Sequence, residues 1–312
     1  MSESDTQNES APGAVPWVED RVRCGCCGAQ MQLDAIRSPD RFFSRDDVYT
    51  LDACPDCGTV VLWAPGWDAE TAYPSDYPAH AADPAVKWYH RALPRYFFPA
   101  VPKGSPDPIV EIGTGTGQFL AYLQGLGRSV SGFEMDEAAV ERARAAGIAV
   151  QPGTWEDFQS EDESVGVLVM NQVIEHLLQP PAGVFAKTLR ALKPGGAWVI
   201  RTPNAGAWGR HHFAGYWHPL EVPRHTVIYS LRGITQLAER AGFSVASARC
   251  CGRWYDFGQS ARYRIDAGAA RPWDYLLDLR KVGSPFSRVL AVAANARGRG
   301  DSMEVILSKP AR

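Results

Sequence analysis

Residues 108–134, PIVEIGTGTGQFLAYLQGLGRSVSGFE, constrain the fold more than any other stretch of the chain. A short apolar run leads into three alternating glycines. Apolar residues then recur at helical spacing, and a second apolar run ends at Glu134. This succession predicts a strand, a glycine turn, a helix and a second strand. The glycines of the turn are Gly113, Gly115 and Gly117.

A turn of this kind lets the backbone approach a ligand closely, while the amides that begin the helix point toward it. An acid at the end of the second strand suits a ribose diol. The G-x-G-x-x-G pattern of dinucleotide-binding proteins is absent, because Gln118 or Leu120 stands where its last glycine would fall.

The pattern Glu111-x-Gly113-x-Gly115-x-Gly117 resembles the first motif of class I S-adenosylmethionine-dependent methyltransferases. Residues 165–176, VGVLVMNQVIEH, and 192–204, LKPGGAWVIRTPN, resemble later segments of that family in the same order. The resemblance implies that the glycine loop holds the methionine part of S-adenosylmethionine and that Glu134 holds the ribose. The implied cofactor site comprises Glu111, Gly113, Thr114, Gly115, Gly117, Glu134, Met135, Trp155, Glu156, Asn171 and Gln172, with Thr154 as a further candidate near the adenine.

Two C-x-x-C turns lie near the N-terminus, each followed by glycine. Each turn can present two thiolates to one tetrahedral ion, so the spacing predicts a structural Zn²⁺ held by four cysteines. A redox pair is the alternative, and Cys26 is an extra thiol that competes with Cys27 for the second position. The predicted ligands are Cys24, Cys27, Cys54 and Cys57.

Residues 49–77 resemble the N-terminal zinc-ribbon region that precedes one branch of these methyltransferases, a branch met in sugar, glycan and natural-product pathways. The segment contains Tyr73 and Tyr77. Two roles are open for these tyrosines: closing over the active site, or packing the ribbon onto the core.

Residues 205–226, AGAWGRHHFAGYWHPLEVPRHT, have no sustained period and are expected to form a loop on the ligand face. Their end resembles the P-R-H signature of the zinc-ribbon branch. His225 is our first choice for a general base and His176 our second. The alternative is that both only dock loops. Arg224 stands where related sugar C-methyltransferases have a glutamate, which favours an oxygen acceptor.

Residues 253–299 form a basic and aromatic insert before the last expected strand. Within it, residues 285–293 predict a short apolar helix, too short to span a bilayer. We expect a lid helix packed on the core, with peripheral contact with a membrane or a lipid-linked substrate as the alternative.

The net charge of −3 gives no basic field for nucleic acid. No apolar run has the length of a membrane helix, and residues 1–16 lack a secretory signal, so we expect a disordered tail and a cytoplasmic protein.

Together these features predict an α/β protein with a Rossmann-like, seven-stranded, doubly wound sheet, preceded by a small zinc-ribbon domain. The expected activity is methyl transfer to a hydroxyl of a small-molecule acceptor. Transfer to carbon or nitrogen stays open, as does a non-catalytic cofactor-binding module whose ribbon holds a partner. The expected division is a tail at 1–16, a ribbon at 17–80, a linking helix at 81–107, and a catalytic domain at 108–312 with a lid at about 253–300.

Overall fold

The computed structural model describes residues 21–74, 85–278 and 284–311. The expected tail at 1–16 and the second tyrosine, Tyr77, lie outside these ranges.

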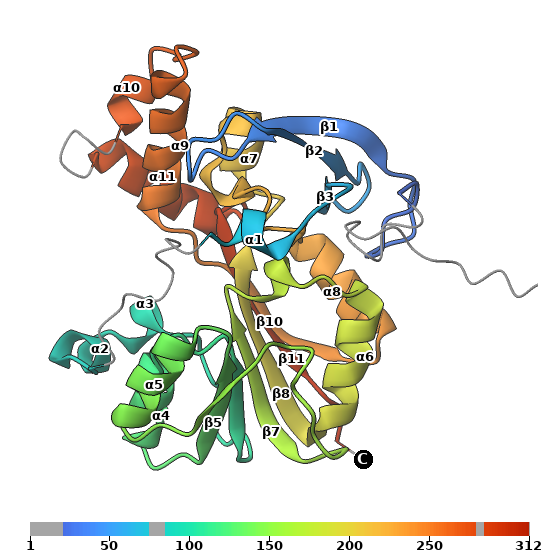
Figure 1. Ribbon diagram of the computed structural model, residues 1–312, viewed down its shortest axis with the longest axis vertical. Coiled ribbons are helices and arrows are strands. Elements are labelled where there is room, and N and C mark those ends of the chain that lie inside the picture. The colour runs from blue at the N-terminus through green and yellow to red at the C-terminus, as the bar shows by residue number, and fades with distance from the viewer. Residues whose placement is uncertain (1–20, 75–84, 279–283, 312) are drawn as a thin grey trace, which may run out of the picture.

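A seven-stranded sheet forms the lower half of the molecule in Figure 1. Its strand order is β10-β11-β8-β7-β4-β5-β6. β11 is antiparallel to both of its neighbours, and the other pairs are parallel, so the sheet is mixed. This confirms the seven-stranded α/β class. The strands are β4 (Ile109–Ile112), β5 (Val130–Glu134), β6 (Val150–Pro152), β7 (Val165–Asn171), β8 (Leu192–Pro203), β10 (Ser244–Cys250) and β11 (Ser302–Ser308).

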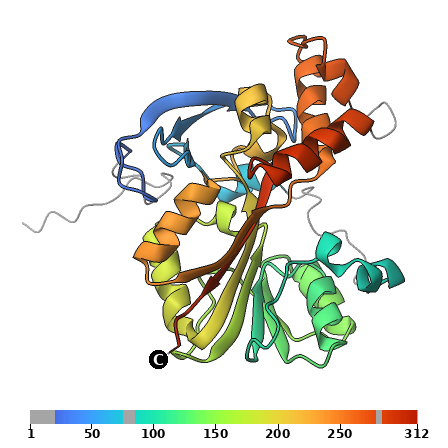
Figure 2. The same cartoon turned by 180° about the vertical axis from the view of Figure 1, so that it is seen from behind.

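Helices cover both faces of this sheet, with α4 and α5 on one side and α6 and α8 on the other (Figures 1 and 2). Two of these helices, α5 and α8, begin with a side-chain N-cap. The Asp136 carboxylate accepts a hydrogen bond from the Ala139 amide at 3.0 Å, and the Ser230 hydroxyl accepts one from the Gly233 amide at 2.8 Å. The helices are α4 (Gln118–Gln124), α5 (Glu137–Ala145), α6 (Pro181–Ala191) and α8 (Leu231–Arg240).

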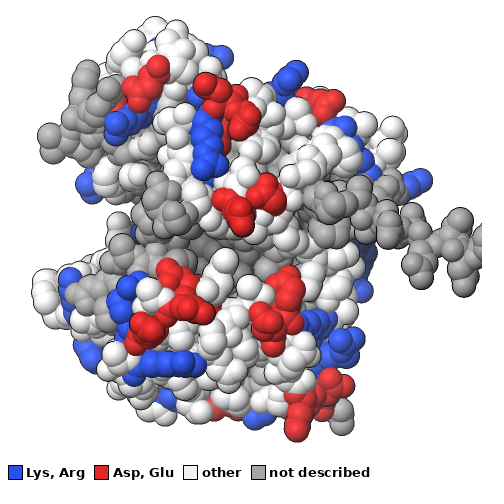
Figure 3. All heavy atoms as spheres, in the orientation of Figure 1, with Lys and Arg blue, Asp and Glu red and all other residues white. Residues whose placement is uncertain are grey.

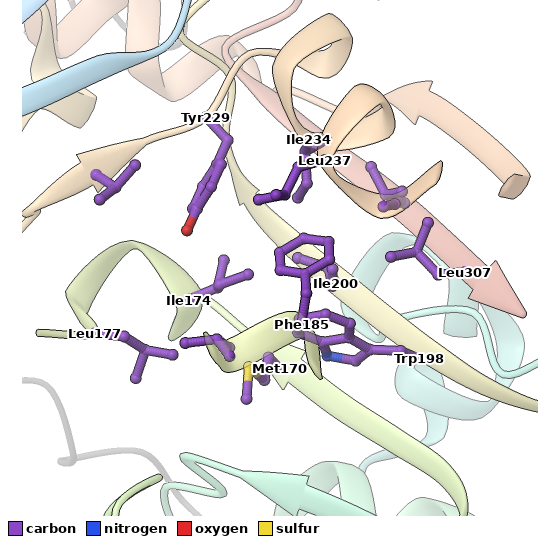
Figure 4. Close-up of a cluster of buried hydrophobic side chains, with 14 of the residues drawn as sticks. Met170, Ile174, Leu177, Phe185, Trp198, Ile200, Tyr229, Ile234, Leu237 and Leu307 are labelled. Atoms are coloured by element: carbon purple, nitrogen blue, oxygen red, sulfur yellow. The ribbon is translucent and has the colours of Figure 1, made fainter. Parts of the chain in front are cut away.

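The buried core between the sheet, α6 and α8 is shown in Figure 4. Phe185 of α6 packs edge-to-face on Trp198 of β8, with ring centroids 4.8 Å apart. The first six residues of β7 are buried, as expected for an apolar strand inside a parallel sheet. This packing fixes the strands whose carboxyl ends carry the candidate site.

The segment expected to be one linking helix is two short ones, α2 (Trp88–Ala92) and α3 (Pro94–Phe97). Pro94 disfavours helical geometry at Leu93, which has φ −130° and ψ 55°. The single-helix prediction is therefore wrong for the described residues of this segment.

The cysteine-rich region is a small antiparallel sheet of β1 (Gln32–Pro39), β2 (Val48–Ala53) and β3 (Val60–Trp63). A fourth strand, β9 (Val227–Ile228), pairs with β3 and begins two residues after His225 of Pro223-Arg224-His225. The cysteine-rich region with β1, β2 and β3, called the ribbon below, thus shares a sheet with the segment that carries His225.

Residues 205–226 are not a plain loop. They contain α7 (Trp208–Phe213) and two 3₁₀ turns, η3 (Ala214–Tyr216) and η4 (His218–Leu220). Burial of Phe213 and Trp217 favours this ordered structure despite the lack of a sequence period.

The insert before β11 is helical and lies beside α7 in the upper half of Figure 1. Its helices are α9 (Trp254–Asp266), α10 (Asp274–Leu277) and α11 (Pro285–Ala296). α11 packs on α9 and extends three residues beyond the expected helix. Phe286, Val289 and Val292 of α11 are exposed. Within the described ranges, no helix combines the length and apolar character needed to cross a bilayer.

Candidate active site

One cavity of about 740 Å³ lies between the sheet and the upper half of the molecule. Figure 3 shows a hollow between these halves, with acidic side chains on both sides of it. The lower wall comprises residues at the carboxyl ends of β4, β5 and β7, where ligands bind in open α/β sheets. The upper wall comes from the segment after β3, from η4 and its flanking residues, and from the start of α9.

The glycine loop after β4 has a backbone conformation that residues other than glycine rarely adopt. Gly113, Gly115 and Gly117 all have positive φ, at 73°, 53° and 77°. A Cβ on Gly113 would collide with Val173, whereas one on Gly115 would enter open space. The open space beside Gly115 lets a ligand approach the backbone.

Two buried glutamates flank this loop. Glu134 accepts hydrogen bonds from the amides of Gly115 at 2.7 Å and Asp136 at 3.0 Å. Oε2 of Glu111 has no hydrogen-bond partner among the described residues. Burial, and secondarily the charge of Glu134, raise the pKa of Glu111 well above its ordinary value. A cationic group entering the cavity would satisfy this carboxyl group.

The expected cofactor residues all line the cavity except Gly117. A Cβ on Gly117 would lie 3.1 Å from the Cβ of Ala143, so this glycine permits close packing of the loop against α5. Trp155 lines the cavity but is also a core residue. Its indole donates to Gln179 at 2.7 Å and stacks on Phe158.

The two expected catalytic histidines, His176 after β7 and His225 after η4, both line the cavity with ring centroids 4.6 Å apart. His225 is 4% exposed, and its Nδ1 lies 2.9 Å from the carbonyl oxygen of Pro219. Nδ1 of His176 lies 2.9 Å from the Tyr73 hydroxyl and 3.2 Å from the Arg224 carbonyl oxygen. Burial is the main cause that lowers the pKa of each histidine to about 3. Both rings are therefore neutral at physiological pH.

Tyr73 lines the cavity and joins the site directly through its contact with His176. Of the two roles expected for this tyrosine, the structure favours the one at the cavity. Its buried hydroxyl has a raised pKa, so it remains protonated and can donate a hydrogen bond.

Arg224 points away from the cavity and docks the ribbon. Its guanidinium makes two hydrogen bonds to Asp40, at 2.7 and 3.0 Å, and both side chains are fully buried. A carboxylate is nevertheless present nearby, because Glu221 lines the cavity with Oε2 3.9 Å from Nε2 of His225. Arg224 at this position therefore does not leave the cavity without a carboxylate.

The sequence alone did not identify four side chains of the upper wall as site residues. Trp67 follows the ribbon and donates through its indole to the Pro223 carbonyl oxygen at 2.8 Å. Glu221 and His218 lie within the segment expected on the ligand face, and Asp256 lies at the start of the insert. The segments were identifiable, but no spacing singled out these side chains.

The four expected cysteine ligands converge, with their sulfurs within 4.8 Å of one another. Cys24 and Cys57 are 3.6 Å apart, and Cys27 and Cys54 are 3.4 Å apart. A tetrahedral Zn²⁺ with bonds of about 2.3 Å places its sulfurs about 3.8 Å apart, so the geometry fits this ion. Cys26 is buried outside this group, which favours Cys27 as the second ligand.

Comparisons with known proteins agree with this geometry. The family model for a methyltransferase domain matches residues 77–248. A protein of Mycolicibacterium smegmatis named a probable S-adenosylmethionine-dependent methyltransferase is 34% identical over 139 residues, which are 44% of this chain and 52% of that protein. The chain thus spans about half the length of that relative. A protein of the same description from Mycobacterium tuberculosis is 27% identical over 220 residues, 66% of this chain and 77% of that one.

Among solved structures, the chain is similar to an S-adenosylmethionine-dependent methyltransferase from Mesorhizobium loti. The TM-score is 0.46 and the identity 18%, over 70% of this chain and 96% of that one. The family model covers more than half of the chain. The protein therefore belongs to the methyltransferase-domain family.

Proposed function

We propose that this chain transfers a methyl group from S-adenosylmethionine to a hydroxyl of a small molecule, of the sugar-containing, glycan or secondary-metabolite class. One observation carries the proposal. A single cavity joins the glycine loop and its two buried glutamates to a wall rich in histidine, tyrosine and carboxylate side chains. Such a cavity can hold a cofactor and an acceptor side by side.

The lower wall supports binding of the cofactor. Glu111 offers an unpaired buried oxygen to the ammonium group, and Gly115 leaves the open space that a close backbone approach needs. Glu134 would accept from the ribose hydroxyls. When bound, the cofactor supplies a methyl group on a positively charged sulfur. Further cofactor contacts are proposed for Thr114, Met135, Trp155, Glu156, Asn171 and Gln172.

The side chains around the two histidines support binding of the acceptor. His176 and His225 are neutral, so each can hydrogen-bond a hydroxyl without charge repulsion toward a cationic cofactor. Tyr73 fixes the ring of His176 through the hydrogen bond at 2.9 Å. We assign these three residues to orienting the acceptor, because positioning supplies much of the rate in a displacement of this kind.

The cysteine cluster supports a structural Zn²⁺ bound by Cys24, Cys27, Cys54 and Cys57. A filled thiolate shell leaves the ion no position for substrate, so it serves folding rather than chemistry. Through β3 and β9, the ribbon would also hold the segment that carries His225.

Transfer to carbon is the second candidate, and Glu221 is the observation that favours it. A carboxylate near His225 could assist removal of a proton from a carbon acid. The two products differ in whether the new methyl group is bound to oxygen or to carbon.

The test incubates the purified chain with S-adenosylmethionine carrying a ¹³C-labelled methyl group and a small-molecule cell extract. We expect a labelled product whose methyl carbon has the chemical shift of a methyl ether. A methyl group bound to carbon would support the second candidate. Cofactor binding without any labelled product would instead favour a non-catalytic module.

A further inference from the structure

We propose that His218 and Asp256 form the proton-accepting pair of this site, with His218 as the catalytic base and Asp256 as its positioning residue. The inference rests on the proposed function, because it names the group that receives the proton of the acceptor hydroxyl. Both residues line the same cavity as the glycine loop. They come from two elements of the upper wall, η4 and α9.

The two side chains are in hydrogen-bonding contact. Nδ1 of His218 lies 3.2 Å from Oδ1 of Asp256, so the carboxylate accepts the Nδ1 proton. That contact selects the tautomer in which Nε2 is unprotonated. Nε2 has no hydrogen-bond partner among the described residues. The imidazole therefore keeps a lone pair for a ligand in the cavity.

The surrounding fold holds this arrangement in place. The His218 amide donates to the Ser260 hydroxyl at 2.8 Å, and that hydroxyl donates to the Asp256 carbonyl oxygen at 2.6 Å. One serine thus ties the backbones of the base and its partner together. The rings of Tyr255 and Tyr263 lie 5.3 and 5.9 Å from the imidazole ring.

The pair is shielded but accessible. The side chains of His218 and Asp256 are 19% and 14% exposed, whereas that of His225 is 5% exposed. A partly desolvated carboxylate beside an imidazole stabilises the imidazolium that forms on proton uptake. Nδ1 of His225 faces a neutral carbonyl oxygen instead, and the Glu221 carboxylate lies 3.9 Å from its Nε2, beyond hydrogen-bonding distance. His218 is therefore better placed than His225 to carry a positive charge during the reaction.

The O–H bond of the acceptor breaks, its proton forms a bond to Nε2 of His218, and the electron pair stays on the oxygen. The Asp256 carboxylate remains ionised and neutralises the new imidazolium. The oxygen is thereby made nucleophilic at the moment of methyl transfer.

The first test needs no acceptor. Nitrogen-15 NMR of the full chain, labelled at histidine, reports which ring nitrogen of His218 carries the proton in the neutral form. The His218→Gln spectrum assigns the resonance among the seven histidines of the chain. We expect protonated Nδ1 and bare Nε2. A proton on Nε2, with Nδ1 unprotonated, overturns the proposal.

The second test measures methyl transfer from labelled S-adenosylmethionine to the same small-molecule extract. His218→Gln and Asp256→Asn should each lower turnover by about 10²–10⁴-fold, the range for general base catalysis, with cofactor affinity unchanged. His211→Gln, an exposed histidine on α7, is the matched control and should keep full turnover. Added imidazole should restore turnover to His218→Gly, an effect that a purely structural residue would not show.

The possible outcomes distinguish a failure of the His218–Asp256 pair from a failure of the proposed methyl transfer. Normal turnover in both His218→Gln and Asp256→Asn overturns the pair while leaving the proposed function intact. Loss of turnover in His225→Gln alone, with rescue of His225→Gly by imidazole, also overturns it and returns the base to His225. Cofactor binding by the wild type with no transfer from it contradicts the proposed function itself, and the NMR result then still decides the geometry of the pair.

Discussion

His225 and His176 show how burial sets the charge of single residues in this site. The two rings contact backbone carbonyl groups, each other and, for His176, the Tyr73 hydroxyl, and neither has a carboxylate within hydrogen-bonding distance. Burial therefore dominates and lowers the pKa of both to about 3. An unfolded chain returns them to about 6.5, so the unfolded state binds more protons as the pH falls below that value.

This difference predicts that the buried histidines destabilise the fold in acid. From pH 7.5 to pH 5.0, His225 alone should remove about 2 kcal/mol from the free energy of unfolding. His225→Gln, which can still donate to the Pro219 carbonyl oxygen, should lose that part of the pH dependence. Urea unfolding of both proteins at the two pH values measures it. An equal decrease in both would show that His225 is not held neutral.

A second prediction at this scale concerns Glu111. Its pKa is raised in the free protein, and a cationic group beside it should restore ionisation, so cofactor binding should release a proton. Calorimetry in buffers of different ionisation enthalpy measures that release. Glu111→Gln should abolish it and weaken S-adenosylmethionine binding by about 1–3 kcal/mol. Glu239→Gln, exposed on α8, should change neither quantity; retained proton release in Glu111→Gln would assign the proton to another group.

At the scale of elements, the ribbon and the His225 segment form one structural unit. β9 pairs with β3, and Arg224 reaches across to Asp40 near the end of β1. The resemblance to the zinc-ribbon branch located both segments but gave no contact between them. Arg224 makes a docking contact here.

We expect Asp40→Ala to cost about 3–5 kcal/mol in the free energy of unfolding, because it removes the carboxylate that makes two hydrogen bonds to the fully buried guanidinium of Arg224, whereas Glu221 contacts Nε at 3.3 Å. The exposed pair of Arg232 and Asp56 provides the control, and Arg232→Ala should cost less than about 1 kcal/mol. Denaturant unfolding measures both. Equal small effects would mean that Arg224 finds another partner or water.

Metal analysis tests the ribbon. The wild type should contain about one zinc per chain, and Cys27→Ser and the double variant Cys54→Ser, Cys57→Ser should lose most of it. Cys26→Ser should keep it, since its sulfur lies outside the converging group. Zinc retained in Cys27→Ser but lost in Cys26→Ser would exchange the two assignments.

At the scale of the whole molecule, short sequence patterns predicted local structure but did not predict contacts between residues far apart in the sequence. The β4–α4–β5 unit, the caps at Asp136 and Ser230, and the four converging cysteines follow from short spacings. The pairing of Arg224 with Asp40 spans 184 positions and that of His218 with Asp256 spans 38. Such contacts depend on how the elements pack, which no short pattern encodes. Pro94 could have predicted the break between α2 and α3. The helical spacing of the aromatic side chains in this segment favoured a single helix instead.

The most direct test of the central claim is calorimetric titration of the wild-type chain with S-adenosylmethionine and, separately, with a nicotinamide dinucleotide. The glycine loop and the two buried glutamates predict saturable binding of S-adenosylmethionine. Glu134→Ala should weaken it by about 1–3 kcal/mol through lost charged hydrogen bonds. Tight binding of the dinucleotide without binding of S-adenosylmethionine would contradict the account.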